Sequence, residues 1–354
     1  MRIVRLIFTL TIIFSFFITD GFCGNIVAAK YAGEFIATGV GARALGMGGA
    51  YVAISEDITA GYWNPAALAQ INYPQIAGMH AQQFANIVNY NYGAVALPFG
   101  RKSTIALSMI RLGVDDIPNT TEALLDYGID GIPNTGDPGE GNGKIDENER
   151  LDRNRVFYFN SAEYALYLSY GAKKSSQLSY GGNLKLVRKG IGENSAWGMG
   201  FDLACLWQPY SHLNVGLNLQ DITTTLLVWD TESGRREAIT PTSKIGIAYF
   251  FESSKIAGQI IPTMDMDVRF ENRRFSAQYN WGRVSFDTHW GMEYRFKKLM
   301  AFRFGLDMGR FTAGFGVKLP KLNVDYAFLS HHDLGDTHRI SLILAIEEER
   351  FKRR

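Results

Sequence analysis

The sequence has little cysteine, little proline and almost no net charge. Two cysteines, Cys23 and Cys205, are too few for a disulfide framework or a cysteine-ligated zinc site. The 36 Lys and Arg residues nearly balance the 35 Asp and Glu residues, so nothing indicates a nucleic-acid partner or a polybasic membrane tether. Only 10 of the 354 residues are proline, whereas 37 are glycine and 13% are aromatic, which is typical of many strands joined by tight turns.

Long apolar runs are also scarce, and the longest lies at the start of the chain. Arg2 and Arg5 precede an apolar stretch that covers 6–18, and small residues follow from Gly21 onward. This pattern predicts a secretory signal peptide at 1–24. A membrane-spanning helix needs about 20 apolar residues, and no run after residue 24 reaches that length. We therefore expect any membrane-embedded part of the mature chain to cross as strands.

Apolar and polar residues alternate from residue 74 onward. At 339–346, for example, Ile340, Leu342, Leu344 and Ile346 share one face of an extended chain. A period of two residues indicates strands. We expect about fourteen, at 74–82, 88–98, 103–112, 162–172, 177–189, 196–208, 212–220, 242–250, 256–269, 285–296, 299–308, 310–318, 322–329 and 337–346.

The length and spacing of these strands favour a membrane barrel at 74–346. Most match the ~9–11-residue tilted spans of outer-membrane barrels, and short turns alternate with longer connections. The fold class expected is therefore all-β: a transmembrane antiparallel β-barrel of about 14 strands in the bacterial outer membrane. A long extracellular loop at 113–161 would lie outside the cell, and a charged tail at 347–354 in the periplasm. A secreted soluble β-sandwich also alternates, but its strands are shorter, with a mode of ~5–6 residues.

The segment at 25–73 does not read as strands. Small residues dominate 33–70, and Asn64-Pro65 fits the start of a helix, with Asn as the cap and Pro at the first helical position. The glycine spacing is not that of a nucleotide-binding loop. The segment has too few large apolar residues to fold alone, and its glycines suit close packing against a wall. We expect a short helical and loop hatch in the lumen of the barrel.

Here the sequence resembles a known family. GARALGMGGAY at 41–51, Glu56-Asp57, and YWNPAAL at 62–68 are similar to the N-terminal signature of the PorV/PorQ family, within the superfamily of FadL-like outer-membrane transport proteins. The resemblance implies a fourteen-stranded barrel with the N-terminal segment packed in its lumen. The candidate hatch and lumen residues are Arg43, Gly46, Gly48, Gly49, Glu56, Asp57, Asn64 and Pro65.

The same resemblance implies a function. PorV-type proteins bind exported proteins in the type IX secretion system, so a non-enzymatic role in binding or shuttling exported proteins is expected. The alternative is a FadL-like transporter of hydrophobic small molecules across the outer membrane. Outer-membrane lipid is a partner in both cases. An enzyme is not expected, because the chain has no G-x-S-x-G motif and lumen charges of both signs are usual in barrels.

One segment of the long loop, 126–149, resembles a calcium-binding loop. With Gly143 at the sixth position of an EF-hand frame, Asp146 and Glu149 fall at the ninth and twelfth, as that frame requires, but Pro138 stands at the first. The candidate ligands for Ca²⁺ are Asp137, Glu140, Asn142, Asp146 and Glu149. A solvated Gly/Asp turn without a metal is the alternative.

Overall fold

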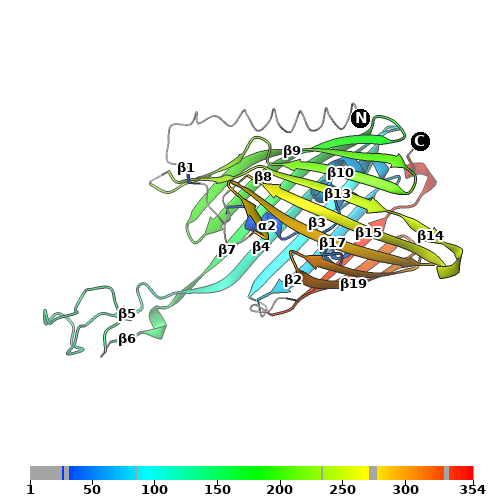
Figure 1. The fold of residues 1–354 in the computed structure, drawn as a ribbon. Helices are drawn as coiled ribbons and strands as arrows, with labels where there is room; N and C mark the ends of the chain where they lie inside the picture. Colours follow the sequence, from blue (N-terminus) through cyan, green and yellow to red (C-terminus); the bar gives the residue numbers. More distant parts are fainter. Residues whose placement is uncertain are drawn as a thin grey trace.

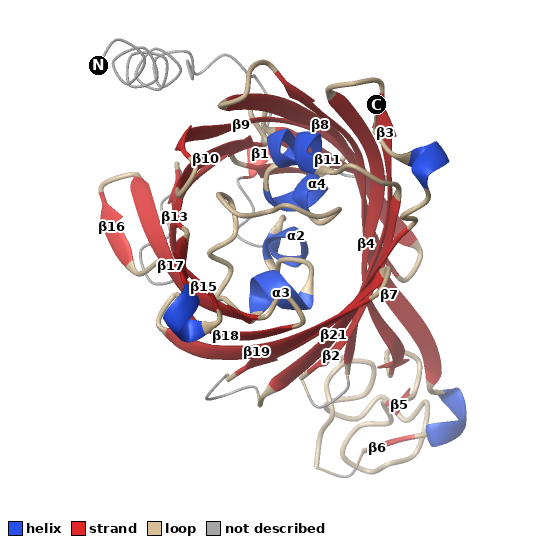
Figure 2. Cartoon of the chain, turned by 90° about the vertical axis from the view of Figure 1, so that its right-hand side faces the viewer, coloured by secondary structure: helices blue, strands red, loops and turns tan. Residues whose placement is uncertain are grey.

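The computed structural model describes residues 26–27, 32–84, 87–147, 149–232, 234–270, 277–330 and 335–353. The predicted signal peptide at 1–24 lies outside these residues. Within them the chain forms a closed antiparallel barrel that surrounds a set of short helices (Figures 1 and 2). No helix in the described ranges is both long and apolar enough to cross a membrane.

Fourteen strands of the described chain make the barrel wall, and each is antiparallel to its neighbours. The last strand closes the barrel on the first, with Gln75 opposite Ala345 and Gln82 opposite His338. The predicted fold class is therefore confirmed. The wall strands are β2 (Gln75–Gln83), β3 (Val88–Phe99), β4 (Ser103–Asn119), β7 (Phe157–Lys173), β8 (Leu178–Ile191), β9 (Asn194–Tyr210), β10 (Leu213–Gln220), β13 (Thr242–Tyr249), β15 (Gly258–Arg269), β17 (Val284–Phe296), β18 (Met300–Asp307), β19 (Arg310–Leu319), β20 (Leu322–Leu329) and β21 (Thr337–Ala345).

The alternation in the sequence separates the two faces of this wall. On β21, Leu342 is 47% exposed on the outer face, whereas its neighbour Ser341 is 4% exposed and faces the lumen. On β18, Phe302 and Phe304 point outward and Arg303 inward. The outer surface is therefore apolar and aromatic, and much of the inner surface is polar, as in barrels that sit in lipid.

Strands β4 and β7 run further than the sequence predicts, so the long loop begins later than residue 113. The ladder between them shifts register between Val114 and Ile117, and Asp116 adopts a positive φ of 58°. This bulge at two adjacent aspartates breaks the alternation that marked the strand. Beyond it β4 and β7 pair again, and in Figure 1 they carry the connection at 120–156 away from the barrel. This connection, which we call the arm, contains the small pair β5 (Leu124–Leu125) and β6 (Arg150–Leu151).

Several short strands extend the wall and were not predicted. β11 (Thr225–Trp229) pairs with the start of β9 and with β12 (Arg236–Ile239), which in turn pairs with β1 (Ile26–Val27). β14 (Phe251–Ser253) and β16 (Tyr279–Trp281) form hairpins with β15 and β17. Each has at most five residues, which is too short for a period-two pattern to stand out.

The hatch lies inside the barrel, as Figure 2 shows. It contains the helices α2 (Glu34–Ala37), α3 (Ala42–Leu45) and α4 (Ala60–Trp63) and the 3₁₀ helix η1 (Pro65–Gln70). Every residue from 39 to 69 is buried except Glu56. Asn64 caps η1 as expected, because its side-chain oxygen accepts a hydrogen bond from Ala66 N at 3.1 Å.

The remaining turns of 3₁₀ helix are η2 (Arg153–Arg155), η3 (Ser254–Ile256) and η4 (Glu349–Phe351). The last belongs to the charged tail, which folds back onto the end of the hatch. Arg353 donates to the carbonyl of Ala69 at 2.6 Å, and its backbone N–H donates to Asn72 O at 2.9 Å. The tail therefore holds the junction where the hatch meets β2.

The outward position of Leu342 yields a prediction about membrane assembly. Leu342→Arg places a charge on the lipid-facing surface, which costs about 2–4 kcal/mol near the bilayer midplane. We expect this variant to lose the heat-modifiable gel migration of a folded barrel, whereas the apolar Leu342→Met keeps it. Normal assembly of Leu342→Arg would show that this face does not contact lipid.

Candidate functional site

The hatch is tied to the wall through the side chain of Arg43, on α3. Its Nε and Nη2 atoms donate to the two carboxylate oxygens of Glu293 at 2.9 and 3.0 Å, a bidentate pair. Arg43 also lies 3.1 Å from Glu56 and 3.5 Å from Asp57, so three of the candidate hatch residues meet at one point. Bidentate Arg–carboxylate pairs combine charge with fixed geometry, which makes this a specific attachment.

Glu293 connects this pair to the rest of the wall. It lies in the last third of β17, is fully buried, and also accepts hydrogen bonds from Arg295 and, at 2.6 Å, from Arg303 on β18. Arg303 then donates to Asp325 on β20 at 2.6 Å. Buried charges are tolerated when they are paired and hydrogen-bonded. In this series of contacts, which runs from the hatch across β17 and β18 to β20, each charged side chain has a partner of opposite charge. We call Arg43, Glu293, Arg303 and Asp325 the latch network.

A second carboxylate holds the backbone of the hatch. One oxygen of Asp265, on β15, accepts hydrogen bonds from the backbone N–H groups of Tyr51 and Val52, both at 2.7 Å. The pattern in the sequence places Asp265 in the lumen, but it does not reveal that its partner is backbone. Such contacts fix the path of a segment that has little regular structure of its own.

A row of asparagines completes the attachment. Asn183 donates to Gly61 O at 2.9 Å, Asn214 to Ala53 O at 3.0 Å, and Asn218 to Trp63 O at 2.9 Å. These side chains lie on β8 and β10, on the face opposite the apolar residues. They were missed as hatch contacts, although their position on the polar face of strands was a signal. Each one satisfies a hatch carbonyl that is buried away from water.

The candidate glycines permit the hatch backbone to lie directly on the wall. A Cβ atom at Gly48, whose φ is +64°, would fall 2.7 Å from the backbone of Leu306, and one at Gly46 would fall 3.0 Å from the Cα of Gly314. The wall supplies glycines of its own, since a Cβ at Gly305 would lie 2.3 Å from the backbone of Met47. Gly49 differs, because its nearest neighbours are the rings of His289 and Trp63 at 3.5 Å. Near the other candidate residue, Pro65, wall glycines Gly171 and Gly181 leave room for its carbonyl.

The lumen has two chemically different halves, and Lys185 of β8, paired with Asp202 and Asp221, adds buried charge beside the second of them. β13 to β21, together with Arg43 of the hatch, contribute charged residues, including the latch network and the cluster formed by Lys244, Asp267, His289 and Asp307. The wall from β2 to β7 instead presents small apolar residues and tyrosines: Ala81, Tyr90, Tyr92, Ala94, Ala106, Ile110, Ala165 and Tyr167. We call this wall the aromatic half.

The hatch packs on the aromatic half through one ring contact and through small residues such as Gly61 and Gly171. Tyr62 meets Tyr167 edge to face at a centroid distance of 6.2 Å, and the Tyr62 hydroxyl donates to Ile36 O at 2.6 Å. The hydroxyls of Tyr90 and Tyr167 are buried and have no hydrogen-bond partner among the described residues. This contact therefore resembles an apolar surface with a few polar points, whereas the contact on the opposite side is ionic.

Two cavities lie where the hatch meets the wall. One of about 400 Å³ opens near the short turns, between Ile54, Glu56 and Gln70 of the hatch segment and residues of β9, β10 and β15. The other, of about 50 Å³, lies towards the opposite end, beside α2, Gln220 and Arg269. The hatch thus fills the middle of the lumen more closely than its ends.

The five candidate calcium ligands lie in the arm. Asp137, Glu140 and Glu149 each accept hydrogen bonds from backbone N–H groups of the loop, and Asn142 donates to Asp146 at 2.8 Å. Asp126 binds the N–H groups of Gly143 and Gly141 at 2.7 and 2.8 Å, and these bonds hold the pKa of its carboxyl below the ordinary value. Among the described residues, no three His, Cys, Asp or Glu side chains are arranged to hold a metal ion. Calcium binding remains a prediction.

No protein-family model matches the chain, and no curated protein does. Solved structures do match it. The toluene transporter TodX of P. putida is 10% identical, with a TM-score of 0.55 over 88% of this chain and 99% of that one. The toluene transporter TbuX of Ralstonia pickettii (13% identity, TM-score 0.52) covers 87% and 97%, and a Pseudomonas aeruginosa FadL homologue (11%, 0.53) covers 87% and 98%. The chain therefore has the fold of FadL-like outer-membrane transporters.

The latch network predicts that Glu293 is important for stability. Glu293→Gln leaves Arg43, Arg295 and Arg303 close together without their shared carboxylate, and breaking a buried pair in this way costs about 3–5 kcal/mol. We expect the free energy of unfolding, measured by denaturant titration in detergent micelles, to fall by that amount. Glu348→Gln is the control, because its pair with Arg350 is exposed on the surface and should contribute less than about 1 kcal/mol. Equal losses in both variants would contradict the role of the latch network.

The close approach at Gly305 predicts a change in the hatch. Gly305→Ala drives a methyl group into the backbone of Met47, so the hatch must shift at a cost of about 1–3 kcal/mol. We expect larger and more frequent conductance steps in planar bilayers than for the wild type. Gly93→Ala is the matched control, since no atom lies within 4 Å of the added methyl group. Identical conductance in both variants would mean that the hatch does not lie against β18.

The calcium hypothesis predicts an effect of chelation on the arm. If Ca²⁺ is bound, removing it frees the carboxylates and exposes the backbone at 126–149 to proteases. We expect limited proteolysis in this segment to quicken in chelator and to slow again when calcium is restored. Glu149→Gln should abolish this difference. Equal cleavage rates with and without chelator would contradict calcium binding. The loop would then be ordered by the hydrogen bonds from its backbone N–H groups to its carboxylates.

Proposed function

We propose that this protein is an outer-membrane channel for hydrophobic small molecules, closed in this state by its hatch. The observation that carries the proposal is the lumen, in which a buried hatch lies between an ionic wall and an aromatic half. The fold supports it, because the matching solved structures include toluene transporters and a FadL homologue.

The two halves of the lumen suggest how such a channel works. The ionic contacts at Arg43 and Asp265 hold the hatch on one side by charge and hydrogen bonds. On the other side the hatch meets rings and small apolar side chains, which lose little when they separate to admit an apolar solute. The solute would therefore pass along the aromatic half while the latch network keeps the hatch attached.

A second candidate function, the binding of exported proteins, is supported by the signature at 41–51 and by the arm, which extends away from the barrel. Within the structure, however, the signature residues act in hatch packing. Arg43 binds Glu293, and Gly46 and Gly48 allow contact with the wall. These contacts serve any barrel closed by this hatch, so the signature does not by itself call for an exported partner.

The proposal is tested by measuring the uptake of a radiolabelled monoaromatic hydrocarbon. The chain is expressed in a Gram-negative host strain that lacks an outer-membrane channel for this solute. We expect the wild-type chain to raise uptake above the empty host. Ala165→Phe fills the aromatic half and should reduce this uptake at least several-fold, whereas Leu166→Phe, on the lipid face, should leave it unchanged. Folding of each variant is checked by heat-modifiable migration. The second candidate would be favoured by two results together. The wild-type chain would give no uptake, and a pull-down with the arm as bait would recover exported proteins.

A further inference from the structure

The short turns at one rim of the barrel have one predominant sign of charge, whereas the tail at 347–353 on the same rim carries three glutamates and three cations. In the described residues of 99–102, 173–177, 209–212, 250–257, 297–299 and 320–321, one carboxylate is present, Glu252. The cations in these ranges are Arg101, Lys102, Lys173, Lys174, Lys255, Lys297, Lys298 and Lys321. In outer-membrane barrels the short turns lie on the periplasmic side, where the leaflet consists of phospholipid. These basic turns therefore meet lipid phosphates.

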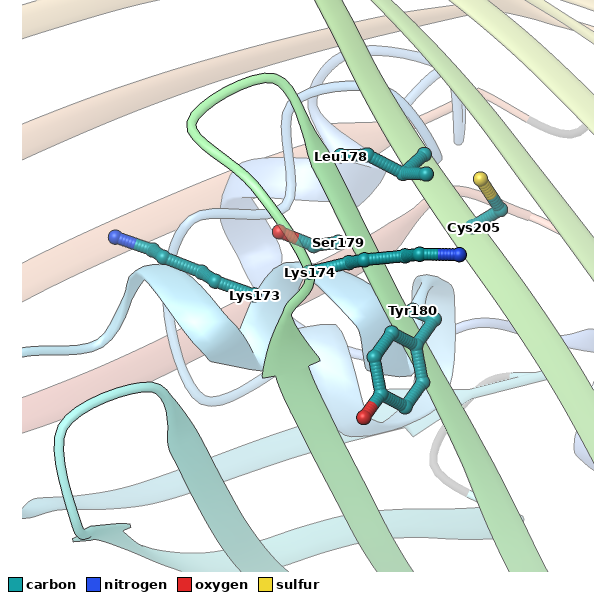
Figure 3. A pocket seen from close by; sticks show the side chains of 6 residues that line it. All are labelled: Lys173, Lys174, Leu178, Ser179, Tyr180 and Cys205. Atoms are coloured by element: carbon teal, nitrogen blue, oxygen red, sulfur yellow. The ribbon is translucent and has the colours of Figure 1, made fainter.

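One part of this rim is hollowed on the outside of the wall. A cavity of about 480 Å³ lies at the turn between β7 and β8, and Lys173, Lys174, Leu178, Ser179, Tyr180 and Cys205 line it. Figure 3 shows Lys174, Leu178, Tyr180 and Cys205 on the same side, and Lys173 pointing away from them. Tyr180 and Cys205 are opposite each other in the β8–β9 ladder, so they form a continuous surface.

The alternation of residues along β8 and β9 shows that this cavity opens on the outer face of the wall. Tyr180 is 49% exposed, and Leu178 and Tyr180 share the lipid-facing side of β8, whereas Ser179 between them is buried. On β9, Cys205 follows Leu203 on the same outer face. The floor of the cavity is therefore in contact with the membrane and not with the lumen.

The lysine at the edge of the cavity is held on a well-ordered turn. Lys174 N donates to Leu178 O at 2.8 Å, and Ser175 Oγ accepts the N–H of Leu178 at 3.1 Å. The side chain of Lys174 is exposed and makes no described ion pair. A fixed turn thus presents a free ammonium group directly beside an apolar floor.

We propose that this cavity is a binding site for one anionic phospholipid. Its phosphate binds Lys174, and the upper part of an acyl chain lies over Leu178, Tyr180 and Cys205. A free phosphate ion has no apolar part to contact the floor, and a lipid without net charge gains less from the lysine. The positive charge of the short turns adds to the preference, since basic residues near an anionic lipid surface attract it. The proposal depends on the barrel lying in a membrane and not on what its lumen conducts.

Cys205 provides the measurement, because a lipid over the floor shields its thiol. The purified chain in non-ionic micelles is alkylated with N-ethylmaleimide, and modification at Cys205 is followed by mass spectrometry. Phosphatidylglycerol should slow this reaction at concentrations where phosphatidylcholine with the same acyl chains has little effect. Inorganic phosphate should have no effect at all.

Variants identify the cation. Lys174→Ala should raise the phosphatidylglycerol concentration for half-protection by roughly fivefold, the effect of one cation near an anionic lipid. Lys174→Arg should retain protection, and Lys321→Ala, which removes a rim cation away from the cavity, should leave it unchanged. Heat-modifiable migration establishes that each variant is folded. Equal protection by both lipids, protection by inorganic phosphate alone, or an unchanged Lys174→Ala would each overturn the proposal.

Discussion

The buried pair between Arg43 and Glu293 is the contact on which the closed state of this barrel depends. A barrel in lipid leaves its lumen polar, and a carboxylate as buried as Glu293 is stable there only with cationic partners. The wall supplies Arg295 and Arg303, and the hatch supplies the third. Because the hatch brings its own arginine to a buried carboxylate of the wall, closing the lumen completes the set of cations around Glu293.

The rest of the hatch follows from this attachment. Once α3 is held at β17, the backbone at 46–52 must run along the wall, which requires glycine at Gly48 and at Gly305 opposite it. Asp265 and the asparagines of β8 and β10 then satisfy the N–H and carbonyl groups that a short, irregular segment leaves unpaired. The hatch therefore obtains from the wall the hydrogen bonds that longer helices would make internally.

The sequence alone was sufficient to place the wall strands, because lipid on one side and a filled lumen on the other impose a period of two on every strand. It could not show which charges pair. Arg43 and Glu293 are 250 positions apart, and their meeting depends on the stagger of strands around the barrel. The bulge near Asp116 and the short strands β11 and β12 were missed for a local reason, since neither shows sustained alternation.

The signature at 41–51 illustrates what a motif can and cannot specify. Its arginine and two of its glycines, Gly46 and Gly48, are explained by contacts with Glu293 and with the wall backbone at Gly314 and Leu306. Contacts of this kind close the barrel whatever it conducts, so the motif defines the architecture and leaves the cargo to other parts. In this chain those parts are the aromatic half of the lumen and the arm at 120–156. The aromatic half lies directly against the hatch and consists mainly of buried apolar surface, so under the proposed function it is the feature that relates closure to an apolar solute.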